Sequence, residues 1–440
     1  MNSNLKVASM IKKSIQLLFK MVKVVCLLSL IGNGSVYANF PINVVRPYDI
    51  DMHWAPQPAG TWEYGVVGEF AGTVNAYNSD GKKTNVLQMW ECNVDSLAML
   101  RGFPSETDIG QTNALLAGAT DNGVRGHVVP TGTLNVWDAS LSIRYFFPAN
   151  LSLGIYLPLY TMSLGDIKWN DLTRNVTDED LLVKEILTDD FPKHVRELSE
   201  TFGCKGKNTL DIGNSWKKTG LGDLTVLGVW SKNFPQVKPV LKNVRLTGRL
   251  GLTIPTGLKT DENLLFPIPY GNDGALGVVF GLNVELQWYN WIRGGVQADF
   301  WKVFGDTRDR RVKTDTSQTD LVLLGKIRTH KEWGFNRRYT LYLELGDFTR
   351  GYSVGFAYQY FNKGGDRLNL VSNTYSTLAA ESATSLEEWK LHNIILDVSG
   401  SFGEKNTSGR TRFSFFYKHP FNGTRAVAAK MFGARFVLDF

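Results

Sequence analysis

In this chain of 440 residues, catalysis or metal binding would depend on histidine and cysteine residues or on glycine-rich phosphate-binding loops. A hydrolase built on a strand would place its nucleophilic serine two positions after a histidine, because both side chains then share one face. The six histidines are His53, His127, His194, His330, His392 and His419. None has serine at that position, no histidine or cysteine cluster has metal-ligand spacing, and no phosphate-binding loop occurs. The sequence therefore predicts a protein that is not an enzyme and needs no cofactor or metal.

Charged residues instead recur at every second position of long extended segments. In Asn243–Pro255, for example, Arg245 and Arg249 share one strand face while valine and leucine residues occupy the other. Two arginines on one face cannot lie in a dry core without partners, whereas they can face water. The charged candidates for an inner, lumen-lining face are Glu63, Glu69, Asp138, Arg144, Arg245, Arg249, Glu285, Asp299, Lys326, Arg328, Glu344, Asp397, Arg412 and Arg435. They could line a water-filled pore, or they could form ion pairs that hold a wall rigid.

The last ten residues indicate which surface the apolar face meets. One face of this strand carries Phe432, Ala434, Phe436, Leu438 and Phe440. The other face carries Gly433, Arg435, Val437 and Asp439. One face suits hydrocarbon and the other suits water, and a chain that ends on an aromatic residue resembles the strand that closes a bacterial outer-membrane β-barrel. A strand in the core of a soluble sandwich is the alternative interpretation.

The number of long alternating segments decides between these two folds. The predicted strands are 62–77, 134–147, 151–164, 221–233, 243–255, 276–288, 293–304, 320–330, 338–361, 390–403, 411–418 and 426–440. Segments of about a dozen residues match what a tilted strand needs to cross hydrocarbon, whereas soluble strands are about half as long. A break near Asp347, or an added strand at 84–90, would raise the total of twelve toward fourteen.

The predicted fold is therefore all-β, a transmembrane antiparallel up-and-down barrel of about 12 strands (12 to 14) with long, partly helical extracellular loops. A mean hydropathy of −0.16, 43 glycines and 12% aromatic residues agree with a barrel in which apolar and polar residues alternate. Aromatic residues near strand ends are expected to form interfacial girdles. These residues are Trp62, Trp230, Trp288, Tyr289, Trp291, Tyr339 and Trp389.

The N-terminus has the order of a secretory signal peptide in residues 1–38. Lysines precede a short apolar run at 24–31, and Val36-Tyr37-Ala38 offers small residues at the cleavage site, so cleavage is expected after Ala38. The true start is either Met1 or Met21. Removing residues 1–38 takes away five lysines and no acidic residue, so the formal charge falls from +6 to +1 (6 − 5). Basic composition therefore gives no case for nucleic acid as a partner.

The expected organisation is a lead-in at 39–61, periplasmic or lumenal, followed by the barrel at 62–440. Large extracellular loops are expected at 78–126, 166–219 and 362–389. Thr177 with Asp180 has the pattern of a helix start, and helices are expected over 178–187 and 193–202. Once Cys26 leaves with the signal, Cys92 and Cys204 remain in two of these loops. They could form a disulfide that ties the loops together, or remain two separate thiols.

A family resemblance appears in the middle strands. Gly220-Leu221-Gly222-Asp223-Leu224 and, one strand later, Gly251-Leu252-Thr253-Ile254-Pro255-Thr256-Gly257 resemble the outer-membrane transporters of the phenol-degradation meta-pathway family. That family is related to the long-chain fatty acid transporters. Its motif residues here are Gly220, Gly222, Asp223, Pro255 and Gly257. In the family, the first motif opens a descending strand and the second closes the next ascending one.

The resemblance implies passive uptake of small, hydrophobic or aromatic solutes through the barrel lumen in the outer membrane of a Gram-negative bacterium. One alternative is a structural or adhesin-like barrel with a sealed lumen and partner-binding loops. A second alternative is a general porin for small solutes. The expected partners are outer-membrane lipids and lipopolysaccharide, the barrel-assembly machinery and a small-molecule solute.

Overall fold

The computed structural model describes residues 57–103, 105–201, 209–348, 351–402 and 410–440. All of them belong to one compact unit, Val36–Phe440. The predicted signal peptide, the cleavage after Ala38 and most of the lead-in lie outside the described residues. No helix in the described part of the chain is long and apolar enough to cross a membrane.

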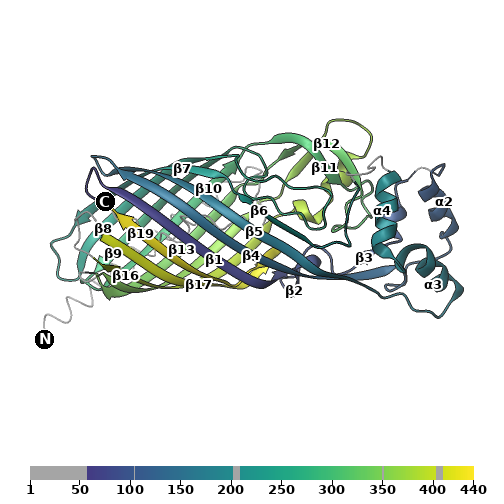
Figure 1. Cartoon of the computed structure of the whole chain (residues 1–440), viewed down its shortest axis with the longest axis horizontal. Helices are drawn as coiled ribbons and strands as arrows, with labels where there is room; N and C mark the ends of the chain where they lie inside the picture. The colour runs from purple at the N-terminus through teal and green to yellow at the C-terminus, as the bar shows by residue number, and fades with distance from the viewer. Residues whose placement is uncertain (1–56, 104, 202–208, 349–350, 403–409) are drawn as a thin grey trace. The chain divides into compact units, whose positions relative to one another are not determined.

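Twelve antiparallel strands form a closed barrel, tilted against its axis (Figure 1). They are β1 (Trp62–Tyr77), β4 (His127–Phe146), β5 (Leu151–Asp171), β7 (Leu224–Pro235), β8 (Leu241–Ile254), β9 (Gly277–Trp288), β10 (Ile292–Val303), β13 (Asn336–Asp347), β14 (Tyr352–Lys363), β16 (Trp389–Phe402), β17 (Arg410–Thr424) and β19 (Met431–Asp439). Each strand pairs with the next one along the barrel. The barrel closes because β1 pairs with β4 on one side and with β19 on the other.

The observed number of barrel strands agrees with the predicted total of twelve, but two errors in the prediction compensate. The segment 338–361, counted as one strand, is two strands, β13 and β14, which separate after Asp347, the position at which a break was considered from the sequence. The segment predicted at 320–330 is not a barrel strand. Strand β12 (Gly325–Glu332) instead joins β11 (Asp306–Val312) and β15 (Arg367–Leu370) in a separate three-stranded sheet. Its sequence, GKIRTHKE, has Ile327 as its one large aliphatic side chain and offers no lipid face.

The two ends of the barrel differ in the length of their connections. Residues 147–150, 236–240 and 289–291 join neighbouring strands at the end where Trp62 and Phe440 exchange backbone hydrogen bonds of 2.8 Å. Ala149 and Asn150 have φ values of 62° and 61° and so make the first of these turns tight. At the opposite end the connection between β17 and β19 is short, at 425–430, and every other connection runs to more than twenty residues. Short periplasmic turns and long external loops are the usual asymmetry of such barrels.

Alternation along each strand separates an apolar outer face from a polar inner face. On β5, Leu151, Leu153 and Ile155 are exposed on the outside, while the side chains of Ser152 and Tyr156 are buried on the inside. Aromatic rings cluster at the short-turn end of this outer face. The rings of Trp62 and Tyr145 lie 4.7 Å apart. These outward rings fit the interfacial girdle of a membrane barrel, whereas Trp389, predicted for the same role, is buried and faces inward.

Shorter elements fill the long connections. They are β2 (Lys83–Asn85), η1 (Val86–Gln88), β3 (Val94–Asp95), η2 (Ala98–Leu100), α2 (Asp108–Leu115), α3 (Asp178–Val183), η3 (Lys184–Thr188), α4 (Phe191–Thr201), β6 (Trp216–Leu221), α5 (Thr377–Glu381), η5 (Thr384–Leu386) and β18 (Ala426–Ala428). Thr177 begins α3 through a capping box with Asp180, as the sequence predicts. Figure 1 shows α2, α3 and α4 beyond the strand ends that lie opposite the C-terminus.

Gly433 on β19 allows this last strand to close against both neighbours. A Cβ atom at Gly433 would lie 2.9 Å from the Gly68 carbonyl oxygen of β1 and would overlap the Phe416 ring of β17. We therefore expect Gly433→Val to prevent closure and to abolish the fast-migrating folded band on unboiled gels. Ala434→Val adds the same methyl groups on the exposed outer face of β19 and should retain that band. Equal folded fractions of the two variants would contradict this role of Gly433.

Candidate functional site

Most of the charged candidates lie on barrel strands in phase with the inner face. Glu63, Glu69, Asp138, Arg144, Arg245, Arg249, Glu285, Asp299, Glu344, Asp397, Arg412 and Arg435 belong to these strands. Lys326 and Arg328 do not, because they lie on β12 in the three-stranded sheet. The prediction that these two residues line the lumen is therefore wrong, because it assumed that 320–330 was a barrel strand.

One group of ion pairs joins the first strands of the barrel to the last. Glu63 on β1 lies 3.5 Å from Arg144 on β4 and also pairs with Arg412 on β17. Arg412 in turn binds Asp439 on β19 at 2.7 Å. Farther along β1, the two oxygens of Glu69 each lie 2.8 Å from Lys418 Nζ. The inner face thus carries cross-links between β1, β4, β17 and β19, the strands on both sides of the closure.

A second group of ion pairs crosses β8, β9, β10 and β13. Arg249 and Arg338 both bind Asp299, at 2.7 Å and 2.5 Å. Beside them Glu285 pairs with Arg245 at 3.0 Å and accepts a hydrogen bond of 2.9 Å from the Tyr342 hydroxyl. These side chains are almost completely shielded from solvent, and Arg338 has no exposed surface at all. The lumen at this level is packed by side chains rather than filled with water.

Several members of both groups were not predicted from the sequence. Arg338, Tyr342, Lys418 and Asp439 were not among the candidates, although each lies in phase with the inner face of its strand. The alternation of side chains along each strand was enough to predict that these four residues face inward. Their pairing across neighbouring strands depends on the strand register, which the sequence does not state.

Lys418 and Glu69 offer a direct test of the closing network, since both are buried. Lys418→Met should destabilise the barrel by about 3 kcal/mol, because it leaves a buried carboxylate without its cation. The double variant Lys418→Met/Glu69→Gln should recover most of that loss. Urea unfolding in detergent, followed by tryptophan fluorescence, measures both values. Lys217→Met, at an exposed lysine on β6, is the matched control. A double variant no more stable than Lys418→Met would show that the pair is not coupled.

The long connections fold inward and fill the outer end of the barrel with apolar side chains. Leu87 and Met89 from the β1–β4 connection, Phe266 from the β8–β9 connection and Leu321 from the β10–β13 connection belong to one buried cluster. The same cluster includes inward residues of β4 and β5, such as Met162. Three connections that are far apart in the sequence therefore share one core at the outer mouth.

The motif residues of the resemblance anchor one of these connections. Asp223, which precedes β7, accepts hydrogen bonds from the backbone N–H of Gly257 at 3.0 Å and from that of Asn272. The Thr256 hydroxyl donates to the Gly222 carbonyl and accepts from the Leu224 N–H, both at 2.9 Å. The Asp223 carboxylate thus holds both ends of the connection 255–276 in place. Gly220 and Pro255 lie in the same region, at the ends of β6 and β8.

Gly271 shows how closely this anchor is fitted. Its φ value of 131° is one that side-chain-bearing residues rarely adopt, and a Cβ atom there would overlap the Asp223 carboxylate. Asp223 is itself 1% exposed. The motif that marks the resemblance therefore has a structural role. It holds the connection 255–276, which forms one wall of a cavity.

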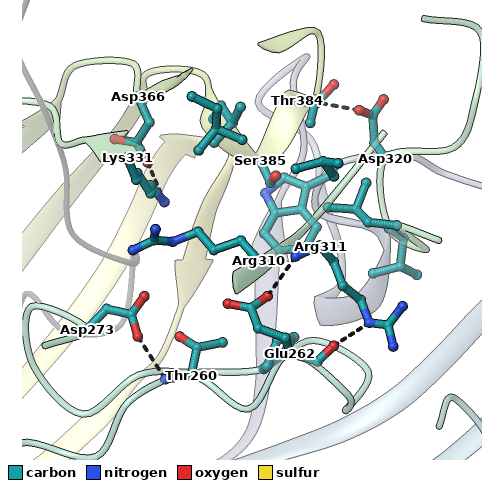
Figure 2. A pocket seen from close by; sticks show the side chains of 18 of the residues that line it. Thr260, Glu262, Asp273, Arg310, Arg311, Asp320, Lys331, Asp366, Thr384 and Ser385 are labelled. Atoms are coloured by element: carbon teal, nitrogen blue, oxygen red, sulfur yellow. Dashed lines mark hydrogen bonds and ion pairs between the residues drawn. The ribbon is translucent and has the colours of Figure 1, made fainter. Parts of the chain in front are cut away.

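A cavity of about 160 Å³ lies between the anchored connection, the three-stranded sheet and the ends of β14 and β16. Its apolar lining includes Trp90, Trp333 and Trp389 together with leucine and proline side chains. Its polar lining carries both signs of charge (Figure 2). Mostly apolar concave sites with a few convergent polar groups are typical of small-molecule sites.

Two groups of ion pairs, each on one wall of the cavity, contribute to its charged lining. On one wall, Asp366 lies 2.9 Å from Lys331 Nζ and 3.5 Å from Lys363 Nζ. On the other, Arg308 pairs with Asp273 and, at 3.0 Å, with Glu262. Burial raises the pKa of Glu262 despite this partner. Figure 2 shows the Arg310 side chain extending between these walls.

An apolar band continues from the cavity along the inner face of the barrel. Trp389 lines the cavity and also belongs to a buried cluster of inward side chains. That cluster contains Tyr77, Tyr156, Leu227, Val229, Val279, Trp301, Phe361, Trp389, Leu391, Ala426 and Ala428. The inner face is therefore not uniformly charged, since apolar side chains of β5, β7, β9, β10, β14 and β16 form a second kind of surface beside the ion pairs.

Glu91 connects three of the outer connections next to the cavity. Its carboxylate accepts hydrogen bonds of 2.9 Å from the backbone N–H groups of Asp320 and Leu321. Asp320 in turn accepts one of 2.7 Å from the Thr384 N–H and pairs with Lys313 at 3.1 Å. Burial raises the pKa of Glu91 to about 7, and this effect exceeds the opposing effect of the two N–H donors.

The attachment made by Glu91 should therefore weaken as the pH rises. A released Glu91 ionises near pH 4.5, whereas the attached carboxyl stays protonated until about pH 7, so the free energy that favours attachment falls between these values. We expect the ratio of the proteolysis rate at pH 8 to the rate at pH 5, measured within the 78–126 connection, to be larger for the wild type than for Glu91→Gln. The glutamine side chain cannot ionise. Glu106→Gln, at an exposed position of the same connection, controls for the protease. The same pH ratio in wild type and Glu91→Gln would exclude Glu91 as the cause.

Of the two cysteines that could form a disulfide, the structure describes only Cys92. Cys92 is exposed and lies 3.9 Å from the Asn78 side-chain nitrogen, while Cys204 lies outside the described residues. The bridge between them stays a prediction.

Comparison with solved structures identifies the class of protein. An outer-membrane channel from Pseudomonas putida F1 has a TM-score of 0.50 and 12% identity, over 90% of this chain and 100% of that one. The CymD monoaromatic hydrocarbon channel has a TM-score of 0.29 and 9% identity, over 93% and 95% of the two chains. A Pseudomonas aeruginosa FadL homologue has a TM-score of 0.28 and 8% identity, over 92% and 94%. The sequence itself matches no family model and no curated protein.

The first of these similarities, together with the closed barrel, shows the fold of an outer-membrane β-barrel protein. At 12% identity it shows the fold alone, and the other two are too weak to support an argument. The membership in the meta-pathway family stays a prediction.

Proposed function

We propose that this barrel provides a passive route across the outer membrane for small, hydrophobic or aromatic solutes. The observation that carries the proposal is the continuity between the cavity and the apolar band, which share Trp389. A solute that leaves water for the tryptophan-lined cavity can remain in contact with apolar side chains as it moves inward. The channel-like fold agrees with this role.

The ion pairs and the apolar band of the lumen would have different roles. The ion pairs around Asp299 and Glu63 hold the strands together, and the apolar band offers contacts that cost a hydrophobic solute little. Because the lumen is packed around Arg338, passage requires side chains of this network to move. The route would then suit solutes that arrive singly, and a wide aqueous pore for general small solutes is disfavoured.

A structural barrel with a sealed lumen is the second candidate. The complete burial of Arg338 and the near-complete burial of Asp299 favour it, since such groups would be wetted in an open pore. In that case the outer connections would bind a partner and the cavity would serve only their packing.

Uptake of a hydrophobic probe by cells with an intact outer membrane separates the two candidates. Cells that express the barrel should take up N-phenylnaphthylamine faster than cells without it. Val279→Asn should slow this uptake about tenfold, the effect of losing about 1.4 kcal/mol of apolar contact at the highest barrier. Ser140→Asn places the same side chain on the inner face outside the band and should have little effect.

Folded protein must be equal in all strains, as judged by heat-modifiable migration. Uptake no faster than in cells that lack the barrel would support the sealed lumen. Equal slowing by Val279→Asn and Ser140→Asn would show that the apolar band is not the route.

A further inference from the structure

One wall of the cavity carries an excess of positive charge. Lys331 on β12 and Lys363 at the end of β14 both pair with the carboxylate of Asp366, at 2.9 Å and 3.5 Å. All three side chains line the cavity and are largely buried. Lys331 Nζ also lies 4.1 Å from the centre of the Trp333 ring, whose face attracts a cation. Two ammonium groups therefore share one carboxylate, which leaves an excess of one positive charge in this group.

Arg310 brings a third cation and a buried hydrogen-bond donor to the same cavity. Its Nη2 atom binds Asp306 Oδ1 at 2.6 Å, and its Nη1 atom binds the Thr329 carbonyl at 3.3 Å. Its Nε atom is buried and makes no hydrogen bond within the described part of the chain. The guanidinium lies 6.0 Å from the centre of the Trp333 ring, and Figure 2 shows the side chain extending across the cavity toward Lys331. A buried N–H group without an acceptor is costly, so this position favours an acceptor atom of a bound molecule.

The opposite wall is balanced in charge, so it does not offset this excess. Glu262 and Asp273 share Arg308 there. Arg311 lies beside them, because its Nε atom donates to the Glu262 backbone carbonyl at 2.5 Å. Two cations therefore accompany two carboxylates on this wall.

The remaining carboxylates of the lining have cations of their own. Asp320 pairs with Lys313 at 3.1 Å, and Glu387 pairs with Arg425 at 3.0 Å. A solute with a negative group would thus meet the excess cation beside Asp366. A cationic solute would have to displace an existing ion pair.

The apolar part of the cavity has the size and the side chains for one aromatic ring. Its lining includes Trp333, Trp389, Leu368 and Leu386. Its volume of about 160 Å³ is close to that of a protein cavity of about 150 Å³ that holds benzene. Trp333 joins the two parts of the site, because the cations of the charged wall lie over its ring.

We infer that the cavity binds aromatic carboxylates, with the carboxylate beside Arg310, Lys331 and Lys363 and the ring against Trp333 and the leucine side chains. The carboxylate oxygens would accept hydrogen bonds from Arg310 Nε and from the ammonium groups, and such charge-assisted bonds are stronger than neutral ones. The inference names a solute class for the proposed route and, as far as transport is concerned, rests on that proposal. Binding in the cavity does not depend on it.

Binding of benzoate to the full-length barrel in detergent at pH 7 tests this inference, with benzyl alcohol and benzylamine as neutral and cationic probes that carry the same ring. Calorimetry should show that benzoate binds at least about tenfold more tightly than either of them. Arg310→Met and Lys331→Met should each weaken benzoate binding by about tenfold and leave benzyl alcohol binding unchanged, since the apolar part of the cavity persists. Arg328→Met removes an exposed arginine of β12, outside the cavity lining, and should change neither affinity.

Heat-modifiable migration must show that each variant is folded. Lys331→Met leaves Asp366 paired with Lys363, so it decides the test if Arg310→Met does not fold. Benzoate binding no tighter than that of benzyl alcohol, tighter binding of benzylamine, or benzoate binding unchanged by these substitutions would overturn the inference.

Uptake of the neutral N-phenylnaphthylamine tests the route separately from the solute class. Faster uptake by cells with the barrel, without benzoate binding to the purified protein, would overturn the solute class alone. Benzoate binding without uptake would support the site and overturn the route.

Discussion

The pairing of β1 with both β4 and β19 is the constraint on which the rest of the structure depends. A strand in a bilayer cannot leave its backbone N–H and C=O groups unpaired, so the sheet must close. Closure through twelve strands fixes the register of every pair, and the register fixes which side chains face inward at each level. The charged inner face follows from this geometry. Several inward carboxylates pair with a cation on a nearby strand, as Glu69 pairs with Lys418 across the glycine at position 433 of β19.

The same constraint explains why the inner face has two surfaces. Buried ion pairs are costly to desolvate, so they are favourable only where geometry supplies several partners at once. Asp299 has such a place between Arg249 and Arg338, and Glu63 has one between Arg144 and Arg412. Elsewhere the lumen is filled more cheaply by apolar side chains such as Leu227 and Val279. A barrel of twelve strands is narrow enough for both kinds of side chain to fill it.

Much of the barrel was predictable because period-two alternation is a local property of the chain. The predicted bounds of β1 are those of the structure, and the inward phase of Arg245, Glu285 and Asp299 follows from alternation alone. Alternation failed at 320–330, where a strand of a small separate sheet resembles a barrel strand over a few residues. It also could not show that Arg338 would meet Asp299, because their sequence positions are related only through the register of β10 and β13.

The structure of the outer connections could not be predicted from a periodic pattern, because these connections have none. They form most of the lining of the cavity. Polar contacts add to the shared apolar core in fixing two of them: Asp223 binds both ends of 255–276, and Glu91 joins the β1–β4 connection to the β10–β13 connection. Each contact buries a carboxylate against backbone N–H groups, which fixes a loop without using a regular element. The barrel could therefore keep its strands while its outer wall changed by a few residues. On the proposed route, specificity for a solute would reside both in the connections that line the cavity and in the apolar band on the strands.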